Sequence, residues 1–147
     1  MVKIENEDLK VDTRIKGVEL LNCSINLPAN PNAPITDFNF NISIESRADA
    51  DNKLLFVIVH VEIRNENQSA VLGTLSVSCI YEIMNFHDVI KTEADGRIHI
   101  PLPLIDTLNS ISISTTRGIM FSTFKGTFLH GAVLPIIDPR QLQTASQ

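Results

Sequence analysis

The side chains that could perform chemistry are few, and they lie far apart in the sequence. The candidate metal ligands and nucleophiles are Cys23, Cys79, His60, His87, His99 and His130. No two of them have the short spacing that places two ligands on one helical face, and no Cys-x-x-Cys pair occurs. The sequence therefore predicts no metal site, no disulfide and no cofactor. We expect both cysteines to be buried and to act as small apolar residues.

The motifs of common enzyme classes are also missing. The chain contains no Gly-x-Ser-x-Gly turn and no glycine-rich phosphate loop,. Glu62 and Glu82 are expected to share one face of a sheet, but carboxylates on a solvated face usually serve solubility. We therefore predict that the protein is not an enzyme. The alternative is an enzyme that binds a small molecule in an apolar pocket.

The bulk composition is that of one folded domain covering residues 1–147, with 44% hydrophobic and 20% charged residues,. The net charge of −5 and the scattered basic residues argue against binding to nucleic acid,. The first residues include several acids where a signal peptide needs an apolar run, and no segment reaches the roughly 20 apolar residues of a membrane span,. A cytoplasmic protein without membrane insertion is expected.

Four segments alternate between apolar and polar residues, the pattern of half-buried strands. They are residues 15–27, 37–45, 54–63 and 75–83. Polar turns are predicted at 46–53 and 65–69, so that the last three strands form a meander. The first strand is expected to turn Leu21, Cys23, Ile25 and Leu27 to one face. One antiparallel sheet of four strands follows.

A long helix is predicted over residues 104–124, where apolar residues recur every three or four positions,. Pro101 and Pro103 precede it, and Gly126 is placed to end it,. The fold class is therefore α+β. Small and apolar residues on this helix could allow another helix to approach closely at a subunit interface, namely Ser112, Thr115, Gly118 and Ile119. The alternative is that the small residues face water.

The segment after the helix is apolar but cannot be regular helix throughout. Its apolar residues are Phe121, Phe124, Phe128, Leu129, Val133, Leu134, Ile136 and Ile137. Large apolar surfaces are rarely left exposed, so the domain itself, another subunit or a ligand must cover this segment. Ordinary core packing is the simpler interpretation.

The same segment carries a resemblance to a known family. Residues 125–137 read Lys-Gly-Thr-Phe-Leu-His-Gly-Ala-Val-Leu-Pro-Ile-Ile. This is similar to the stretch Arg-Gly-Thr-Phe-Pro-x-Leu-x-Leu-x-Pro-Val-Asn that follows the main helix of the SecB protein-export chaperones. Residues 22–30, with Ala33-Pro34 after them, and residues 80–83 resemble two further SecB segments in the same order.

The resemblance implies a SecB-like fold that assembles as a homotetramer, a dimer of dimers with the helices between two sheets. It also implies a chaperone that holds unfolded or exported polypeptides translocation-competent in apolar grooves. An apolar groove favours unfolded clients because only they expose apolar side chains. The candidate groove residues, or the residues packed beneath the groove, are Tyr81, Ile83, Phe86, Phe121, Phe124, Phe128, Leu129, Val133, Leu134 and Ile136.

Recruitment of the SecA motor is left open by the resemblance. Acidic residues help to recruit SecA in the export chaperones, and the matching positions here hold Cys23, Leu27 and Thr74. The alternative function is a SecB-like chaperone dedicated to one partner, such as the antitoxin of a toxin–antitoxin–chaperone system. Residues 1–14 and 143–147 are expected to form a flexible arm and tail.

Overall fold

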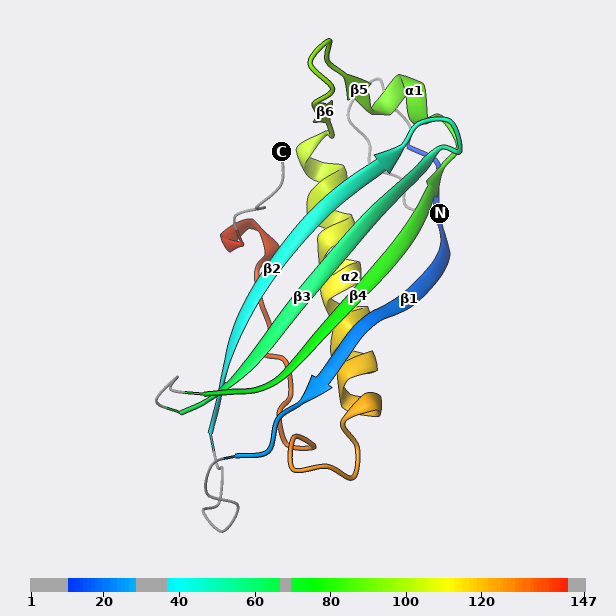
Figure 1. The fold of residues 1–147 in the computed structure, drawn as a ribbon. Helices are drawn as coiled ribbons and strands as arrows, with labels where there is room; N and C mark the ends of the chain where they lie inside the picture. Colours follow the sequence, from blue (N-terminus) through cyan, green and yellow to red (C-terminus); the bar gives the residue numbers. More distant parts are fainter. Residues whose placement is uncertain (1–10, 29–36, 67–69, 143–147) are drawn as a thin grey trace.

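The fold is α+β, with one antiparallel sheet and one long helix (Figure 1). A computed structural model describes residues 11–28, 37–66 and 70–142. The elements are β1 (Thr13–Ile25), β2 (Phe38–Asp49), β3 (Leu54–Asn65), β4 (Val71–Ile83), α1 (Phe86–Val89), β5 (Lys91–Thr92), β6 (Ile98–His99), α2 (Leu102–Thr123) and the 3-10 turn η1 (Pro139–Gln141).

The strand order is β1-β4-β3-β2, which leaves β1 and β2 at the two edges of the sheet. The predicted meander of the last three strands is confirmed, and β1 pairs with β4 rather than with its neighbour in sequence. Val77 stands opposite Val59 on β3 and opposite Leu20 on β1, so directly paired residues continue one apolar face across the sheet,.

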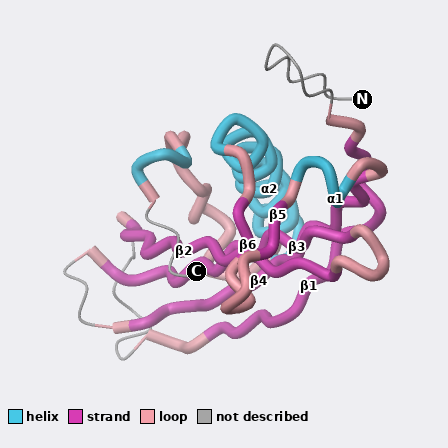
Figure 2. The backbone as a smooth tube through the Cα atoms, turned by 90° about the horizontal axis from the view of Figure 1, so that it is seen from above, coloured by secondary structure: helices cyan, strands magenta, loops and turns pink. Residues whose placement is uncertain are grey.

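Helix α2 packs on this apolar face, as seen from above in Figure 2. Leu104, Leu108 and Met120 recur at helical spacing and are fully buried,. The Tyr81 hydroxyl lies 2.7 Å from the Ser112 hydroxyl and 3.3 Å from the Leu108 carbonyl oxygen, which it donates to, so strand and helix are also joined by polar contacts. The helix ends just before Gly126, whose φ of +83° is one that glycine adopts without strain,.

The chain after α2 returns along the same face of the sheet, beside β2 (Figure 1). Leu129, Ala132 and Leu134 from this segment are buried in the core. Arg117 of α2 fixes its path, because Nε donates to the Leu134 carbonyl at 2.7 Å and an Nη donates to the Pro135 carbonyl at 2.7 Å. The apolar segment is therefore partly covered by the domain itself.

Several sequence-based expectations need correction at element ends. Strand β2 continues through Ser46 to Asp49, so the turn is confined to residues 50–53. In β1 the pairing skips Leu21, which lies at a register shift, so Leu20 shares the inner face with Cys23,. Of the expected arm over residues 1–14, the structure describes 11–14, and there Val11 is buried and Thr13 begins β1. The expected tail, 143–147, lies outside the described residues.

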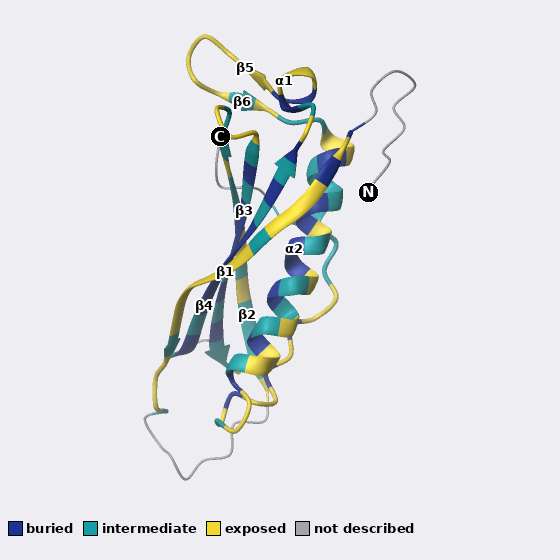
Figure 3. Ribbon diagram, turned by 90° about the vertical axis from the view of Figure 1, so that its right-hand side faces the viewer, coloured by how far each residue is buried: buried dark blue, intermediate teal, exposed yellow. Residues whose placement is uncertain are grey.

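Cys23 is exposed, against the expectation that both cysteines are buried, whereas Cys79 is buried. Both point to the inner face, but α2 crosses β3 and β4 and leaves β1 uncovered (Figure 3). Helix α2 is not apolar enough to cross a membrane, and no other helix in the described part of the chain is long enough.

Candidate binding groove

The ten candidate groove residues divide into two groups by burial. Six of them have less than 2% of their surface exposed and belong to the core: Tyr81, Ile83, Phe86, Phe124, Leu129 and Leu134. A client could reach these side chains only if the domain opened. Of the two roles expected for them, their burial fits packing beneath a groove. The physical reason is that regular apolar spacing marks the side of an element that its own domain covers.

The other four candidates are accessible and follow one another over the end of α2 and the returning segment. They are Phe121, Phe128, Val133 and Ile136, the last of which is 98% exposed. Phe121 packs its ring against His130 at a centroid distance of 5.5 Å. These side chains offer apolar surface that a partner could contact.

An apolar groove runs between the inner side of β2 and the returning segment. Its volume is about 410 Å³, and most of its lining is apolar: Phe38, Asn39, Phe40, Ile42, Pro135, Ile137 and Leu142. The groove exists because α2 covers the central strands and leaves the β2 side to the irregular chain after it. Strand β2 is an edge strand, so its outer main-chain groups have no neighbouring strand among the described residues,. We call this site the β2 groove.

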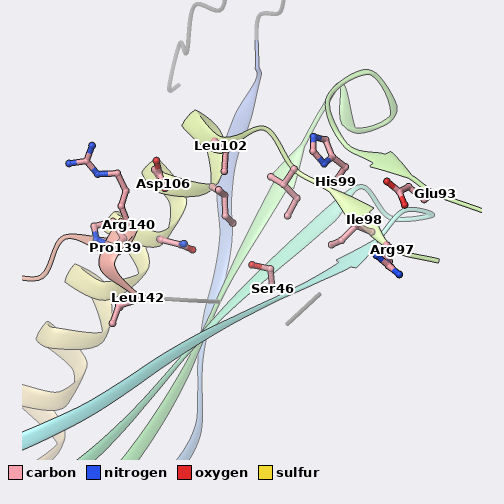
Figure 4. Close-up of a pocket in the computed structure, with 13 residues that line it drawn as sticks. Ser46, Glu93, Arg97, Ile98, His99, Leu102, Asp106, Pro139, Arg140 and Leu142 are labelled. Atoms are coloured by element: carbon pink, nitrogen blue, oxygen red, sulfur yellow. The ribbon is translucent and has the colours of Figure 1, made fainter. Parts of the chain in front are cut away.

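A larger cavity of about 680 Å³ continues along β2 at the upper end of the sheet (Figure 4). Its walls come from β2, the β5–β6 hairpin, the start of α2 and η1: Ser46, Glu93, Arg97, Ile98, His99, Ile100, Leu102, Ile105, Asp106, Asn109, Pro139, Arg140 and Leu142. Leu142 lines both sites, so the cavity adjoins the β2 groove. We call it the upper cavity.

The sequence predicted part of this lining, but as buried strand residues and not as residues of a groove. Phe38, Phe40 and Ile42 were expected on the buried face of a strand, and they are only half-buried because the helix stops short of β2. Ile137 belonged to the apolar segment, but no pattern indicated that it faces β2. The upper cavity had no sequence signal, because its walls come from residues 46 to 142.

The polar side chains that could take part in catalysis lie on the opposite face of the sheet. His60 Nδ1 lies 2.7 Å from Ser76 Oγ, and His60 Nε2 lies 3.1 Å from Glu45 Oε1. The hydrogen bond from His60 and the charge of Arg47 lower the pKa of Glu45. This order of groups matches that of a nucleophile, a base and an orienting acid. However, β3 and β4 are paired on both sides, so their main-chain N–H groups cannot form an oxyanion hole,. We interpret the three residues as a cross-strand network.

Glu62 and Glu82 do lie on one face, but they are eight strand positions apart, since Glu82 stands opposite Leu54. At about 3.3 Å per residue, that separates them by roughly 26 Å. Glu82 pairs instead with Arg14 at 2.8 Å. No cluster of three metal-binding side chains occurs among residues 11–28, 37–66 and 70–142.

A second apolar surface lies on β1, beyond the reach of α2 (Figure 3). Its inner-facing residues Ile15, Val18, Leu20 and Ile25 each expose at least 40% of their surface. We call them the β1 surface. Of the residues expected at a helix interface, Ser112 is fully buried against Tyr81 and so belongs to the core. Gly118 is exposed, and Thr115 and Ile119 are half-buried.

The comparisons with known proteins rest on structure, because no family profile matches the chain and no curated protein sequence does. The fold is similar to a Mycobacterium tuberculosis SecB-like chaperone, solved in complex with a ChAD peptide from the HigA1 antitoxin. The TM-score is 0.53 with 13% identity, over 84% of this chain and 83% of that one. A Streptococcus agalactiae protein of unknown function aligns with a TM-score of 0.41 and 7% identity over 80% of this chain and 90% of that one, too weakly to support an argument. The fold of this chain is SecB-like.

Proposed function

We propose that this protein is a molecular chaperone that holds unfolded polypeptides in the β2 groove and the upper cavity. The observation that carries the proposal is an apolar groove beside an open strand edge. An extended client can add main-chain hydrogen bonds along such an edge while its side chains enter the groove. Each fully buried large apolar side chain contributes about 1.5–3 kcal/mol, so binding accumulates over several contacts without a unique sequence.

The fold comparison supports this proposal, since the M. tuberculosis SecB-like chaperone was solved with a bound peptide. That peptide comes from an antitoxin, and this favours the alternative in which the present chain serves one dedicated partner. Purification of the protein from its own host distinguishes a dedicated chaperone from a general one. A single partner at constant stoichiometry indicates a dedicated chaperone, and a mixture of unfolded proteins indicates a general one.

We further propose that the protein works as a homotetramer in the cytoplasm. The β1 surface supports this, because four inner-facing apolar side chains exposed on one edge strand are unusual for a monomer,. Of the four residues expected at a helix interface, Thr115, Gly118 and Ile119 are still accessible for contact between subunits. A role in export through SecA has no support in the described residues, since Cys23 and Thr74 are not acidic.

The test is suppression of aggregation of a slowly refolding protein by the Phe40→Ser variant. Phe40 is half-buried and lines the β2 groove. Phe56→Ser is the matched control, because Phe56 is also half-buried but lies on the opposite face of the sheet. Phe40→Ser is expected to lose at least tenfold in client affinity, since burial of a phenylalanine contributes about 1.5–3 kcal/mol. Equal suppression by two folded variants argues against the β2 groove.

A further inference from the structure

Asn109 lies in the wall of the upper cavity, and its side-chain oxygen is covered and has no hydrogen-bond partner among the described residues. The residue is 3% exposed, it lines the cavity, and its Oδ1 atom accepts no hydrogen bond from the described residues. A buried polar group left unpaired costs about 1–3 kcal/mol. Asparagine is also a poor helix former, and Asn109 lies in the interior of α2,. Asn109 therefore destabilises the fold in two ways, through its unpaired oxygen and through its low helix propensity. A residue kept at such a cost points to a function in binding.

The chemistry around Asn109 restricts what can occupy the cavity. Ile98, Ile105 and Leu142 supply apolar walls. The two arginines are already paired within the chain, Arg97 with Asp95 at 2.9 Å and Arg140 with Asp138 at 2.8 Å. Two further carboxylates, those of Glu93 and Asp106, line the same cavity, so an anionic occupant is disfavoured,. The cavity suits a ligand with apolar groups and a neutral hydrogen-bonding group.

A peptide group has the matching chemistry, because it carries one N–H donor and one carbonyl acceptor. The side-chain amide of Asn109 is complementary, because its Oδ1 can accept from the peptide N–H and its Nδ2 can donate to the peptide carbonyl. The upper cavity also adjoins the β2 groove at Leu142, and Phe40 and Ser46 are six residues apart on β2. At about 3.3 Å per residue this is roughly 20 Å, the length of six extended client residues. One extended chain that passes over Leu142 is therefore long enough to reach both sites.

We propose that the Asn109 side chain turns towards the cavity and binds a main-chain peptide group of the client, while a neighbouring client side chain packs against Ile98, Ile105 and Leu142. This inference rests on the proposed function and deepens it. Asn109 would recognise the client's backbone, which is a feature that every unfolded chain shares. Asn109 is then a residue that selects extended polypeptide over other apolar ligands, whatever the client sequence.

The experiment is a binding cycle between the protein side chain and the peptide backbone. The probe is a fluorescein-labelled, end-capped decapeptide with alternating leucines, together with ten esters that each replace one backbone amide by an ester and so remove one N–H. Wild type, Asn109→Leu and the control Asn41→Leu, an exposed residue on the opposite face, are titrated by fluorescence anisotropy. Asn109→Ala repeats the measurement with a side chain that cannot overfill the cavity.

We expect Asn109→Leu to bind the all-amide peptide about three- to tenfold more weakly, the value of one hydrogen bond. One or two ester positions should weaken binding to wild type by a similar factor and have no effect on Asn109→Leu, whereas Asn41→Leu behaves as wild type. The urea midpoint of Asn109→Leu should equal or exceed that of wild type, because a buried, unpaired oxygen is removed,. A purely structural role of Asn109 predicts a lower midpoint instead.

Two results overturn the inference. If every ester weakens binding equally for wild type and for both Asn109 variants, Asn109 binds no peptide group and the inference fails. The proposed function still stands in that case, as long as wild type binds the peptide and suppresses aggregation. If wild type neither binds the peptide nor suppresses aggregation, the proposed function itself fails, and the inference fails with it.

Discussion

At the scale of single residues, Tyr81 is the most informative probe of the core. It is the only tyrosine in a chain without tryptophan, and it lies fully buried between β4 and α2. Burial raises the pKa of the Tyr81 phenol well above its ordinary value near 10,. In the unfolded chain the phenol ionises near pH 10, so its contribution to stability is complete below that pH and is lost as the pH rises further.

The titration of Tyr81 is therefore expected to coincide with alkaline unfolding. The absorbance of tyrosinate should stay low past pH 10 and rise together with the loss of circular dichroism, and Tyr81→Phe provides the blank. Tyrosinate formation near pH 10 with the secondary structure intact would show that Tyr81 is exposed to solvent. Tyr81→Phe should also lower the free energy of unfolding by about 1–2 kcal/mol through the lost hydrogen bonds to Ser112 and Leu108,.

Two glycines predict opposite effects of the same substitution. A Cβ at Gly73 would lie 2.7 Å from Cδ1 of Leu129 and 3.0 Å from the Ser24 carbonyl oxygen, whereas a Cβ at Gly118 meets nothing within 4 Å. Gly73→Ala should destabilise the fold by about 1–3 kcal/mol. Gly118→Ala should stabilise the domain by about 0.5–1 kcal/mol, as in other helix interiors. Urea denaturation measures both, and a shift of the same sign in the two variants contradicts this account.

At the scale of elements, Arg117 determines where the wall of the β2 groove stands. Its two hydrogen bonds to consecutive carbonyls hold an irregular segment that has no strand or helix pairing of its own. Arg117→Ala is expected to cost about 1–2 kcal/mol, less than a fully buried charged pair because the side chain is half-exposed,. The groove should loosen as well.

Hydrogen exchange of residues 134–137 is the measurement for this element. Exchange there should accelerate in Arg117→Ala, and suppression of aggregation should weaken in the same variant. Arg47→Ala, at an exposed arginine on β2, is the matched control and should leave both unchanged. Unaltered exchange in Arg117→Ala would mean that apolar packing of Leu134 alone holds the segment.

At the scale of the whole molecule, the β1 surface predicts assembly. The double variant Val18→Lys, Leu20→Lys introduces two charges on the inner side of β1, where both native side chains are about half-exposed and can be replaced without opening the core. We expect its mass to fall from tetramer towards monomer in chromatography with light scattering, with unchanged circular dichroism. Glu19→Lys, on the other face of the same strand, is the control.

Either of two results contradicts the assembly proposal. A wild-type protein that is monomeric at micromolar concentration shows that the β1 surface stays open to solvent. A double variant that retains the tetramer mass shows that the subunits meet through another surface, with Gly118 and Ile119 of α2 as the next residues to test.

The sequence by itself determined the long elements and, except at Leu21 of β1, which way their residues face. Period-two alternation identified all four long strands, and helical spacing identified α2 within two residues at its start. These patterns are readable because a half-buried strand or helix must repeat its apolar residues at the period of its own backbone. They also predicted that Tyr81, Phe124 and Leu129 lie on the apolar side of their segments. Only the structure distinguishes a core position from a groove position.

Tertiary structure alone decided which surfaces stay open. The pairing of β1 with β4 joins residues such as Cys23 and Leu75, 52 positions apart, and no local pattern encodes that contact. Because α2 lies over the central strands, Cys23 and Phe40 are more exposed than their apolar pattern indicates. Asn109 looks like any helix residue in the sequence. The role proposed for it arises only because the fold buries it beside a cavity and leaves its Oδ1 without a hydrogen-bond partner among the described residues.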